Sequence, residues 1–431
     1  MHHPRVLHVG FNAIGSPTNT GLTLASMFGA WPRENLFELY THSGQSRTAA
    51  GPNIRLAPLS TAPADGLVRA LMGERLPKPV ADGLNNSVRR PNGLPLKTRI
   101  RLAATTLNDV GPVWTGGGWL RDIEEFQPQV IHSLLGGVRI TKFVAALASR
   151  LELPVVPHFM DDWMDNLFND GQLWGMARRE TERSVRRVLE HTPRILTIGS
   201  AMQAEYAARL ERPADVVGNS ADFDHYDGLV AQRHSPMEGP LTLRYVGGLH
   251  LGRADVLHSV GGALIGQQHG GRPWELALNV PDHDLALAER LAAGVKSITN
   301  GGNLVPSEVP RTIVNSDALL FLESSDPNIA PFTRLSVSTK VPEYLASGRP
   351  VLAIGPPDQA SIQTLLRTGV AVHGGDGTSD ADVRDALPAL NTALQGTSAR
   401  HRHAGPAIRD EFGRSQTQER LRQALMRAAK S

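Results

Sequence analysis

The chain has 431 residues, of which 41% are hydrophobic and 20% charged, with a formal net charge of +2 and no cysteine. This length allows two or three domains, each with its own core, and the composition is ordinary for a soluble globular protein. The missing cysteine excludes disulfides and thiolate metal sites and fits the cytoplasm, while the small net charge gives no argument for a nucleic-acid partner. No apolar run of about 18 residues is present, so we expect neither a membrane span nor a signal peptide.

The N-terminal residues predict the opening of a doubly wound α/β domain. An apolar run over residues 5–10 ends at a glycine, a loop of small residues follows from Gly15 to Gly21, and residues 22–28 have a helical pattern. Strand, small-residue loop and helix in this order begin such domains. The loop lacks the Gly-x-Gly-x-x-Gly spacing, so we do not expect a dinucleotide site there. A tight turn that needs small residues is one interpretation of Gly15.

A basic segment interrupts the pattern after predicted strands over residues 36–40 and 53–56. Between residues 69 and 101 the chain has eight Lys or Arg against two acids, with scattered Pro and Gly. We interpret residues 67–103 as an insertion in the N-terminal domain. It is either a solvated loop, which we favour, or a segment that contacts an anionic membrane surface or a lipid diphosphate.

A histidine and three acids follow one of the predicted strands. The apolar run over residues 153–159 contains His158 near its end, and Asp161, Asp162 and Asp165 come directly after it. Open parallel sheets bind ligands at the carboxyl ends of their strands, so these ionisable groups are candidates for a site. Asp161 or Asp162 could act as a general base, and the three acids could also hold a metal. For Asp162 we favour a cap of the following helix.

Strands and helices continue to alternate into a second α/β domain. The polar stretch over residues 224–240 lacks an apolar period and is interpreted as a linker. The apolar run over residues 241–246, which ends in Gly247 and Gly248, begins the second domain. Further strands are predicted over residues 129–133, 194–200, 274–278, 295–298, 317–322, 351–354 and 370–372.

The most informative stretch of the chain runs from Ser338 to Val351. Either Ser338 or Thr339 is placed to cap a short helix, and Gly348 is placed to end it before an apolar strand. The start of a helix suits a phosphate group, where Lys340 would add a positive charge. Glu343 lies one turn further along and could accept hydrogen bonds from a ribose. On spacing alone, an ordinary surface helix is equally consistent.

The run from Ser338 to Val351 resembles the donor-binding helix of the GT-B glycosyltransferases, which reads Ser-x-Lys-x-x-Glu-Tyr-Leu-Ala-x-Gly-x-Pro-Val. The resemblance implies an α/β fold of two doubly wound, Rossmann-like domains that face a central cleft. We therefore expect an N-terminal acceptor-binding domain over residues 1–223, the linker 224–240 and a nucleotide-sugar-binding domain over 241–405. Residues 406–431 would form a terminal helix that braces the first domain.

The resemblance also implies a hexosyltransferase activity and assigns roles to the candidate residues. A sugar would pass from a UDP- or GDP-linked donor to a hydroxyl of a glycan or lipid-linked acceptor, in glycan, glycolipid or cell-envelope polysaccharide synthesis. We expect no metal or other cofactor, no nucleic acid, and a cytoplasmic location, with membrane contact through residues 67–103 as an open alternative. The catalytic residues would be His158, facing the donor sugar, and Asp161, and the donor-binding residues would be Gly15, Gly247, Arg253, Ser338, Thr339, Lys340 and Glu343.

The chain departs from the family pattern at three positions of the expected donor site, and Gly218 stands in place of a proline at the end of the first domain. Gly248 and Ala254 stand where many relatives have an Arg and a Lys that neutralise the leaving diphosphate, so Arg253 and Lys340 would take over that work. Leu335 stands where retaining relatives have a first glutamate, so the motif does not define the stereochemistry. Two rivals therefore stay open: a nucleotide-sugar epimerase of the same fold, and a sugar-nucleotide-binding protein without catalysis.

Overall fold

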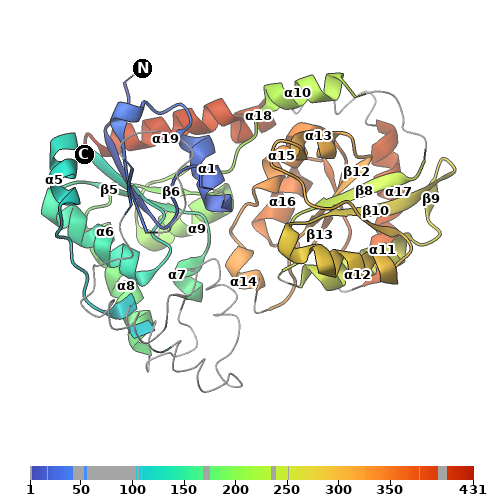
Figure 1. The fold of residues 1–431 in the computed structure, drawn as a ribbon, viewed down its shortest axis with the longest axis horizontal. Helices are drawn as coiled ribbons and strands as arrows, with labels where there is room; N and C mark the ends of the chain where they lie inside the picture. The colour runs from blue at the N-terminus through green and yellow to red at the C-terminus, as the bar shows by residue number, and fades with distance from the viewer. Residues whose placement is uncertain are drawn as a thin grey trace. The chain divides into compact units, whose positions relative to one another are not determined.

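The structure is a computed structural model, and it describes residues 2–16, 18–41, 53–55, 103, 106–107, 109–167, 175–233, 239–250, 252–327, 329–377, 379–396 and 405–431. It divides into two compact units, Met1–Gly218 with Thr417–Ser431, and Asn219–Gln416. Each unit is a doubly wound parallel sheet covered by helices, which confirms the predicted fold class (Figure 1). Residues 67–103, which we interpreted as a basic insertion, lie outside the described residues apart from the last position, 103.

The first unit is built on a parallel sheet of seven strands in the order β3-β2-β1-β4-β5-β6-β7. The apolar runs of the sequence form these strands because both faces of the sheet are covered, so every side chain of β1, β2, β4 and β5 is buried. The order reverses direction between β1 and β4. The strands are β1 Val6–Gly10, β2 Leu36–Tyr40, β3 Asn53–Arg55, β4 Val130–Ser133, β5 Val155–Phe159, β6 Ile195–Thr197 and β7 Ala214–Val216.

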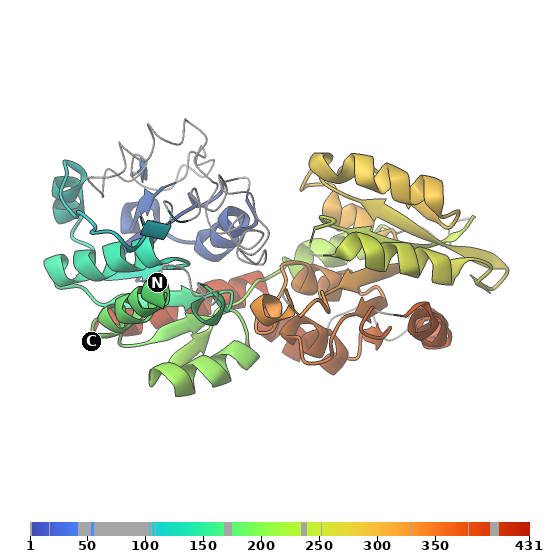
Figure 2. The same ribbon diagram turned by 90° about the horizontal axis from the view of Figure 1, so that it is seen from below.

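Helices cover both faces of this sheet (Figures 1 and 2). Leu36 of β2 packs in one core with α1 and α19, whereas the ring of its neighbour Phe37 contacts Phe126 of α5. Because successive strand residues point to opposite faces, α1 and α19 lie on one side of the sheet and α5 on the other. The helices are α1 Asn19–Phe28, α5 Trp119–Phe126, α6 Val138–Leu151, α7 Trp163–Asn166, α8 Met176–Leu189, α9 Ser200–Leu210 and α19 Arg414–Ala428, with a 3-10 turn η1 at Arg33–Asn35.

The C-terminal helix α19 completes the core of the first unit. Its side chains at Leu421, Ala424, Leu425 and Ala428 are fully buried against strands and α1, and Gln418 Nε2 donates a hydrogen bond of 2.8 Å to the carbonyl of Ser26. The expected single helix over residues 406–431 is instead two helices. The first, α18 (Pro406–Phe412), belongs to the second unit, because the break at Gly413 separates it from α19.

The second unit is built on a sheet in the order β11-β10-β8-β12-β13-β14, with β9 paired antiparallel to the edge of β10. Strand order reverses between β8 and β12, so this point is the topological switch of the sheet. The strands are β8 Leu241–Val246, β9 Gln268–His269, β10 Arg272–Asn279, β11 Ile298–Asn300, β12 Ala318–Leu322, β13 Val351–Ile354 and β14 Ala371–His373. The helices are α11 Arg253–Leu264, α12 Leu285–Gly294, α13 Val309–Val314, α14 Ala330–Thr333, α15 Lys340–Ser347, α16 Ala360–Arg367 and α17 Asp380–Gly396, with a 3-10 turn η3 at Asp282–Asp284.

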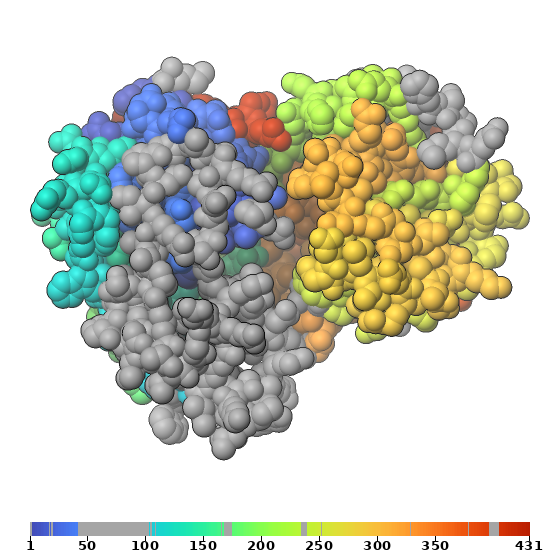
Figure 3. All heavy atoms as spheres, viewed as in Figure 1, coloured from blue at the N-terminus to red at the C-terminus, as the bar shows by residue number. Residues whose placement is uncertain are grey.

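The interpreted linker, residues 224–240, is wrong in its first half. The structure has a helix there, α10 (Phe223–Ala231), which Asp222 caps by accepting a hydrogen bond of 3.1 Å from the backbone N–H of His225. Phe223 and Tyr226 are buried, and α10 packs on α13 and α15, as the green and orange atoms of this unit show in Figure 3. Two large apolar residues three positions apart are enough to bury this helix, although its exposed residues are polar.

Candidate functional site

The candidate site lies in the second unit, at the carboxyl edge of the sheet where strand order reverses. Strand β8 ends before Gly247, β12 ends before Glu323, and the helices α11 and α15 begin at Arg253 and Lys340. Doubly wound sheets bind their ligands at this point because the loops diverge there and helix N-termini point toward it. The predicted residues Gly247, Arg253, Ser338, Thr339, Lys340 and Glu343 are therefore brought to one region.

Helix α15 is formed as the sequence predicts, with one difference at its start. Gly348 ends the helix with a φ of 63°, the left-handed conformation that glycine adopts without strain. Thr339 occupies the N-cap position, but its side chain is exposed and does not cap the helix. Ser338 is held by Ser361, whose hydroxyl accepts a hydrogen bond of 3.1 Å from the Ser338 N–H. Ser338 rather than Thr339 serves the first turn of α15: its Oγ accepts a hydrogen bond of 3.4 Å from the Lys340 N–H, and its carbonyl accepts one of 3.1 Å from the Val341 N–H.

Lys340 lies at the centre of the site. Its Nζ atom is 5.0 Å from the centre of the Tyr245 ring, a favourable position for a cation. Gly247 leaves the space for this ammonium group, because a Cβ on Gly247 would lie 2.3 Å from Lys340 Nζ. Burial lowers the pKa of Lys340 to about 7, helped by the charge of Arg253 and opposed by Glu323 and Glu343. A bound anion would favour the charged form of the lysine.

Tyr245 also shapes the loop that follows β8. Its hydroxyl donates a hydrogen bond of 2.7 Å to the carbonyl of Gly248, and Asp284 Oδ2 accepts one of 2.7 Å from the N–H of Leu249. His250, at the end of this loop, is exposed, and partial desolvation lowers its pKa to about 4, helped chiefly by the charges of Arg253 and Lys340. His250 is therefore neutral near pH 7 and can donate one hydrogen bond to an anion.

Arg253 begins α11 after Gly252, whose φ of 74° turns the chain into the helix. Its charge acts on Tyr245, His250 and Lys340, which places all four side chains in one neighbourhood. The Nε atom of Arg253 is buried and has no hydrogen-bond partner within the part of the chain that the structure describes. A guanidinium group next to an ammonium group is unfavourable unless an anion joins them, which is what a diphosphate would supply.

Two carboxylates complete the site. Glu323, which follows β12, is 6% exposed, and Glu343 is half-buried one turn after Lys340. Burial raises the pKa of Glu343 to about 7, and the charges of Lys340 and Arg414 oppose this shift. Leu335, where relatives would have a first glutamate, is 3% exposed and belongs to the interior. Besides Glu343, the carboxylate of Glu323 also raises the pKa of Lys340. The sequence analysis did not identify Glu323 as a site residue.

His158 was expected to face the donor sugar, and the structure places it elsewhere. Its side chain is fully buried in the first unit, and its Nε2 donates a hydrogen bond of 2.8 Å to the carbonyl of Val217. Its Nδ1 lies 3.4 Å from His132 Nε2. Burial lowers the pKa of His158 to about 4. The residue points into the layer covered by α1 and α19, because the alternation along β5 puts it on the same face as Val156 of that core.

His158 ends a chain of three buried histidines. Because Val217 offers only an acceptor, His158 carries its proton on Nε2 and accepts at Nδ1 from His132 Nε2–H. His132 Nδ1 then accepts from His8 Nδ1–H at 2.9 Å. All three rings are fully buried and neutral, with the pKa of His8 lowered to about 3 by burial. This chain is a polar network inside a core, in which each ring is bonded to its neighbour and, among the described residues, His8 Nε2 at its end is left without a partner.

The remaining predicted residues of the first unit lie in loops. Asp161 is exposed in the turn after β5. The prediction that Asp162 caps the next helix is wrong, because its side chain makes no such bond. Asp162 is 3% exposed, and its Oδ1 accepts a hydrogen bond of 2.6 Å from the Tyr206 hydroxyl. Gly15 has a φ of 79° in a tight turn that the Ser16 N–H closes by donating to the carbonyl of Ala13 at 3.0 Å, and its own N–H donates to the carbonyl of Gly21 at 2.8 Å. These residues belong to a different unit from the Lys340 cluster.

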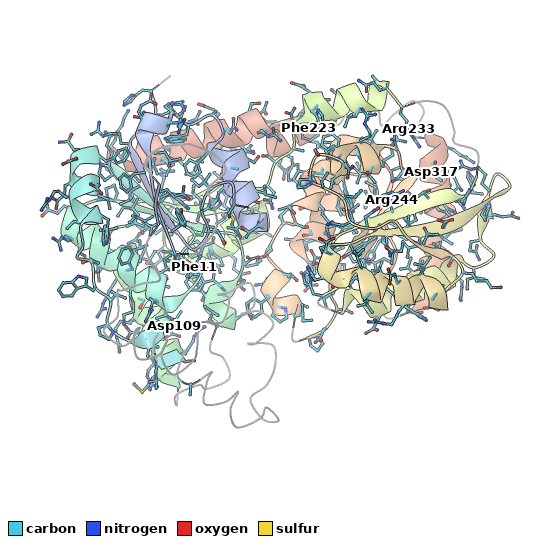
Figure 4. The ribbon with its side chains drawn as sticks, viewed as in Figure 1. Phe11, Asp109, Phe223, Arg233, Arg244 and Asp317 are labelled. Atoms are coloured by element: carbon cyan, nitrogen blue, oxygen red, sulfur yellow. The ribbon has the colours of Figure 1, made fainter. Side chains whose placement is uncertain are left out.

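A second charged group lies at the opposite end of β8 and β12 and is structural (Figure 4). Asp317 accepts a hydrogen bond of 2.9 Å from the N–H of Thr242 and lies 3.5 Å from both Arg233 and Arg272. Arg244 donates to the hydroxyl of Ser316 at 2.7 Å and to Asn279 Oδ1 at 2.6 Å. Asp317 is thus paired with two guanidinium groups and Arg244 is held by neutral acceptors, so the group fixes the start of the two strands.

The described residues show neither a membrane-crossing helix nor a metal cluster. No described helix is long and apolar enough to cross a membrane. Within the same ranges, no group of three or more His, Asp or Glu side chains is arranged to hold a metal ion.

No protein-family model and no curated protein sequence matches this chain. Solved structures do resemble it over its whole length. HepE from Anabaena in complex with UDP has a TM-score of 0.59 at 12% identity, covering 98% of this chain and 100% of that one. A trehalose 6-phosphate synthase from Burkholderia multivorans has a TM-score of 0.63 at 12% identity, covering 100% and 98%. A sucrose-phosphate synthase from Thermosynechococcus elongatus has a TM-score of 0.59 at 10% identity, covering 98% of each chain.

These likenesses establish the fold. The chain has the GT-B fold of two Rossmann-like units, as the Ser338–Val351 motif predicted. At 10–12% identity the likeness carries no more than the fold, so the chemistry has to be argued from the residues of the site.

Proposed function

We propose that the protein is a glycosyltransferase that moves a hexosyl group from a nucleoside-diphosphate sugar to an acceptor hydroxyl. The observation that carries the proposal is the position of Lys340. It begins helix α15 at the topological switch of the second unit, with Glu343 one turn further on. An anion-binding helix start, a cation and a carboxylate in this order match a diphosphate followed by a ribose.

The residues of the site divide the work of holding such a donor. Lys340, Arg253 and the first turn of α15 would hold the diphosphate and neutralise the charge that develops as it leaves. Neutral His250 would donate a further hydrogen bond. Glu343 would accept hydrogen bonds from the ribose hydroxyls, and Gly247 would keep the space for the lysine. In this proposal, Lys340, Arg253 and His250 replace the Arg and Lys that many relatives have at the positions of Gly248 and Ala254.

The finer points of the proposal follow from the sequence and from the neighbours. One structural neighbour was solved with UDP and another with UDP-2-fluoro glucose, which favours a UDP-linked donor over a GDP-linked one. We propose a glycan or lipid-linked acceptor that binds the first unit, with exposed Asp161 as the candidate general base and no metal or other cofactor. A cytoplasmic protein in polysaccharide synthesis is the corresponding biological setting, with membrane contact through residues 67–103 as the open alternative to a solvated loop.

Calorimetric titration with UDP and GDP tests the donor site. We expect wild type to bind one of them and Lys340→Ala to lose affinity by about 50-fold, because hydrogen bonds to charged groups contribute about 1.5–3 kcal/mol. Lys296→Ala removes an exposed lysine of the same unit and should bind normally. Equal binding by the Lys340→Ala variant would contradict the proposal.

Turnover of nucleotide sugars, measured with and without an acceptor pool, tests the reaction. A transferase releases the nucleoside diphosphate chiefly when an acceptor hydroxyl is supplied. Consumption or epimerisation of the donor alone would point to an epimerase instead. Tight binding of the donor with no turnover in any acceptor pool would point to a protein that binds sugar nucleotides without catalysis.

A further inference from the structure

The second unit buries a tyrosine hydroxyl that has no partner. Tyr226, on α10, is 3% exposed, and its Oη atom has no hydrogen-bond partner within the described residues. A buried hydroxyl without a partner is unfavourable, because it has given up hydrogen bonds to water without replacing them. Such a group is therefore either a defect of the core or a donor reserved for another state of the molecule.

The surroundings of Tyr226 favour the second explanation. Helix α10 packs directly on α15, the helix that carries Lys340 and Glu343. The charge of Glu343 reaches Tyr226: after burial, it is the largest cause of the raised pKa of the tyrosine. Arg414 acts on both Tyr226 and Glu343. The packing of α10 on α15 therefore brings the unpartnered hydroxyl into the neighbourhood of the carboxylate that the proposed function assigns to the ribose.

Helix α10 is held in place by several polar contacts. Asp222 caps the helix, and its Oδ2 lies 3.3 Å from Arg414 Nη1. Arg409 Nη2 lies 2.5 Å from Asp227 Oδ2. The Arg409 guanidinium also lies over the ring of Phe223, 5.3 Å from its centre. These contacts fix the backbone of the helix that carries Tyr226.

Glu343 needs such a donor to do its assigned work. To accept hydrogen bonds from ribose hydroxyls it must be ionised, and burial disfavours the ionised form. A hydrogen bond donated to the carboxylate would stabilise that form and would fix its direction. Lys340 and Arg414 supply charge, but in the proposed donor complex Lys340 would be engaged by the diphosphate.

We propose that Tyr226 is a positioning residue of the ribose subsite, and that its hydroxyl donates a hydrogen bond to the Glu343 carboxylate when the nucleotide is bound. This inference rests on the proposed function, because it assumes that Glu343 binds the ribose. It assigns a residue outside the Ser338–Val351 motif to the same subsite.

The test is Tyr226→Phe, titrated with UDP, or with GDP if wild type prefers it, across a pH series. Loss of a hydrogen bond to a charged group should lower affinity about tenfold near pH 7. Affinity falls on the acid side as Glu343 becomes protonated, and this limb should move to higher pH in the variant. The alkaline limb, set by Lys340, should stay. The melting temperature of the free variant should not fall, since the lost hydroxyl had no partner.

Two controls separate this role from a purely structural one. Tyr206→Phe removes a buried hydroxyl of the first unit that does have a partner, and it should leave nucleotide affinity and its pH profile unchanged. In a Glu343→Ala background, which removes the acceptor, Tyr226→Phe should have no further effect on affinity, because the two residues act through one bond. Additive losses, or an acid limb that stays in place in Tyr226→Phe, would overturn the inference.

The outcomes also distinguish this inference from the proposed function. If wild type binds neither UDP nor GDP, the proposed function fails and the inference fails with it. If wild type binds, Lys340→Ala does not, and Tyr226→Phe binds as wild type does, then only the role of Tyr226 is wrong. Weaker binding of a 2′,3′-dideoxy nucleotide that is no longer sensitive to Tyr226→Phe would place the effect at the ribose.

Discussion

The two units have the same architecture and place ionisable residues near the reversal of strand order, yet the two groups differ in what they leave unpaired. In the first unit, His8, His132 and His158 are fully buried, neutral and bonded to one another, so the one ring nitrogen without a partner among the described residues, His8 Nε2, carries no charge. In the second unit, Lys340, Arg253 and Glu343 are only partly buried, and their charges oppose or support one another without a closed set of partners. Ionisable side chains at a switch point therefore do not by themselves indicate a ligand site; unsatisfied charge does.

Acidification from pH 7 to pH 5 should have the largest effect, and it should act on the first unit. An unfolded histidine has a pKa near 6.5 and takes up a proton in this range, whereas burial keeps the pKa of His8 at about 3 and that of His158 at about 4. The unfolded state binds more protons, so the free energy of unfolding falls as the pH is lowered. Between pH 7 and pH 5 the loss is about 2 kcal/mol for each of these two residues. Denaturant unfolding at both pH values measures this loss.

The variant His8→Leu is the matched comparison for this prediction. It removes one titrating residue from the end of the chain of histidines. Between pH 5 and 6, the variant should therefore take up about one proton fewer on unfolding than wild type, and its free energy of unfolding should change less steeply with pH. An unchanged slope would show that His8 is not kept neutral by the fold.

Gly247→Ala should have the next largest effect, in the second unit. A Cβ at this position would lie 2.3 Å from Lys340 Nζ, and the φ of 149° is unfavourable for any other residue. We expect a loss of about 2 kcal/mol in stability and of at least about tenfold in nucleotide affinity, as the lysine is displaced. Gly266→Ala is the control, because Gly266 also has a positive φ, 76°, but no atom lies within 4 Å of its Cβ. Equal losses of affinity in both variants would contradict the role of Gly247.

Tyr206→Phe should have the smallest effect. It removes the 2.6 Å hydrogen bond to Asp162, so we expect a loss of about 1 kcal/mol in the stability of the first unit. Thermal unfolding measures it. A change in nucleotide affinity of more than about twofold, within the usual effect of remote substitutions, would break the distinction between a structural first group and a ligand-binding second one.

The local features of the site could be predicted from the sequence, whereas its three-dimensional neighbours could not. Helix α15, its end at Gly348 and the strand after it follow from residues adjacent in the chain. Tyr245, His250 and Glu323 lie about 20 to 95 positions from Lys340 in the sequence, and only the strand order brings them to it. His158 was misplaced for a related reason: the alternation of a strand defines two faces, but not which one is open. Helix α10 was not predicted because only two of its residues, Phe223 and Tyr226, are buried, which is too few to give an apolar periodicity in the sequence.

The contribution of α19 to the first unit has a consequence for synthesis on the ribosome. The second unit, Asn219–Gln416, is continuous in sequence, so it can fold as it emerges, whereas the first unit needs Thr417–Ser431 from the far end of the chain. Until then, the apolar surface that Leu421 and Leu425 will cover stays open to solvent and to chaperones. The half of the protein that is translated first is therefore the half that matures last.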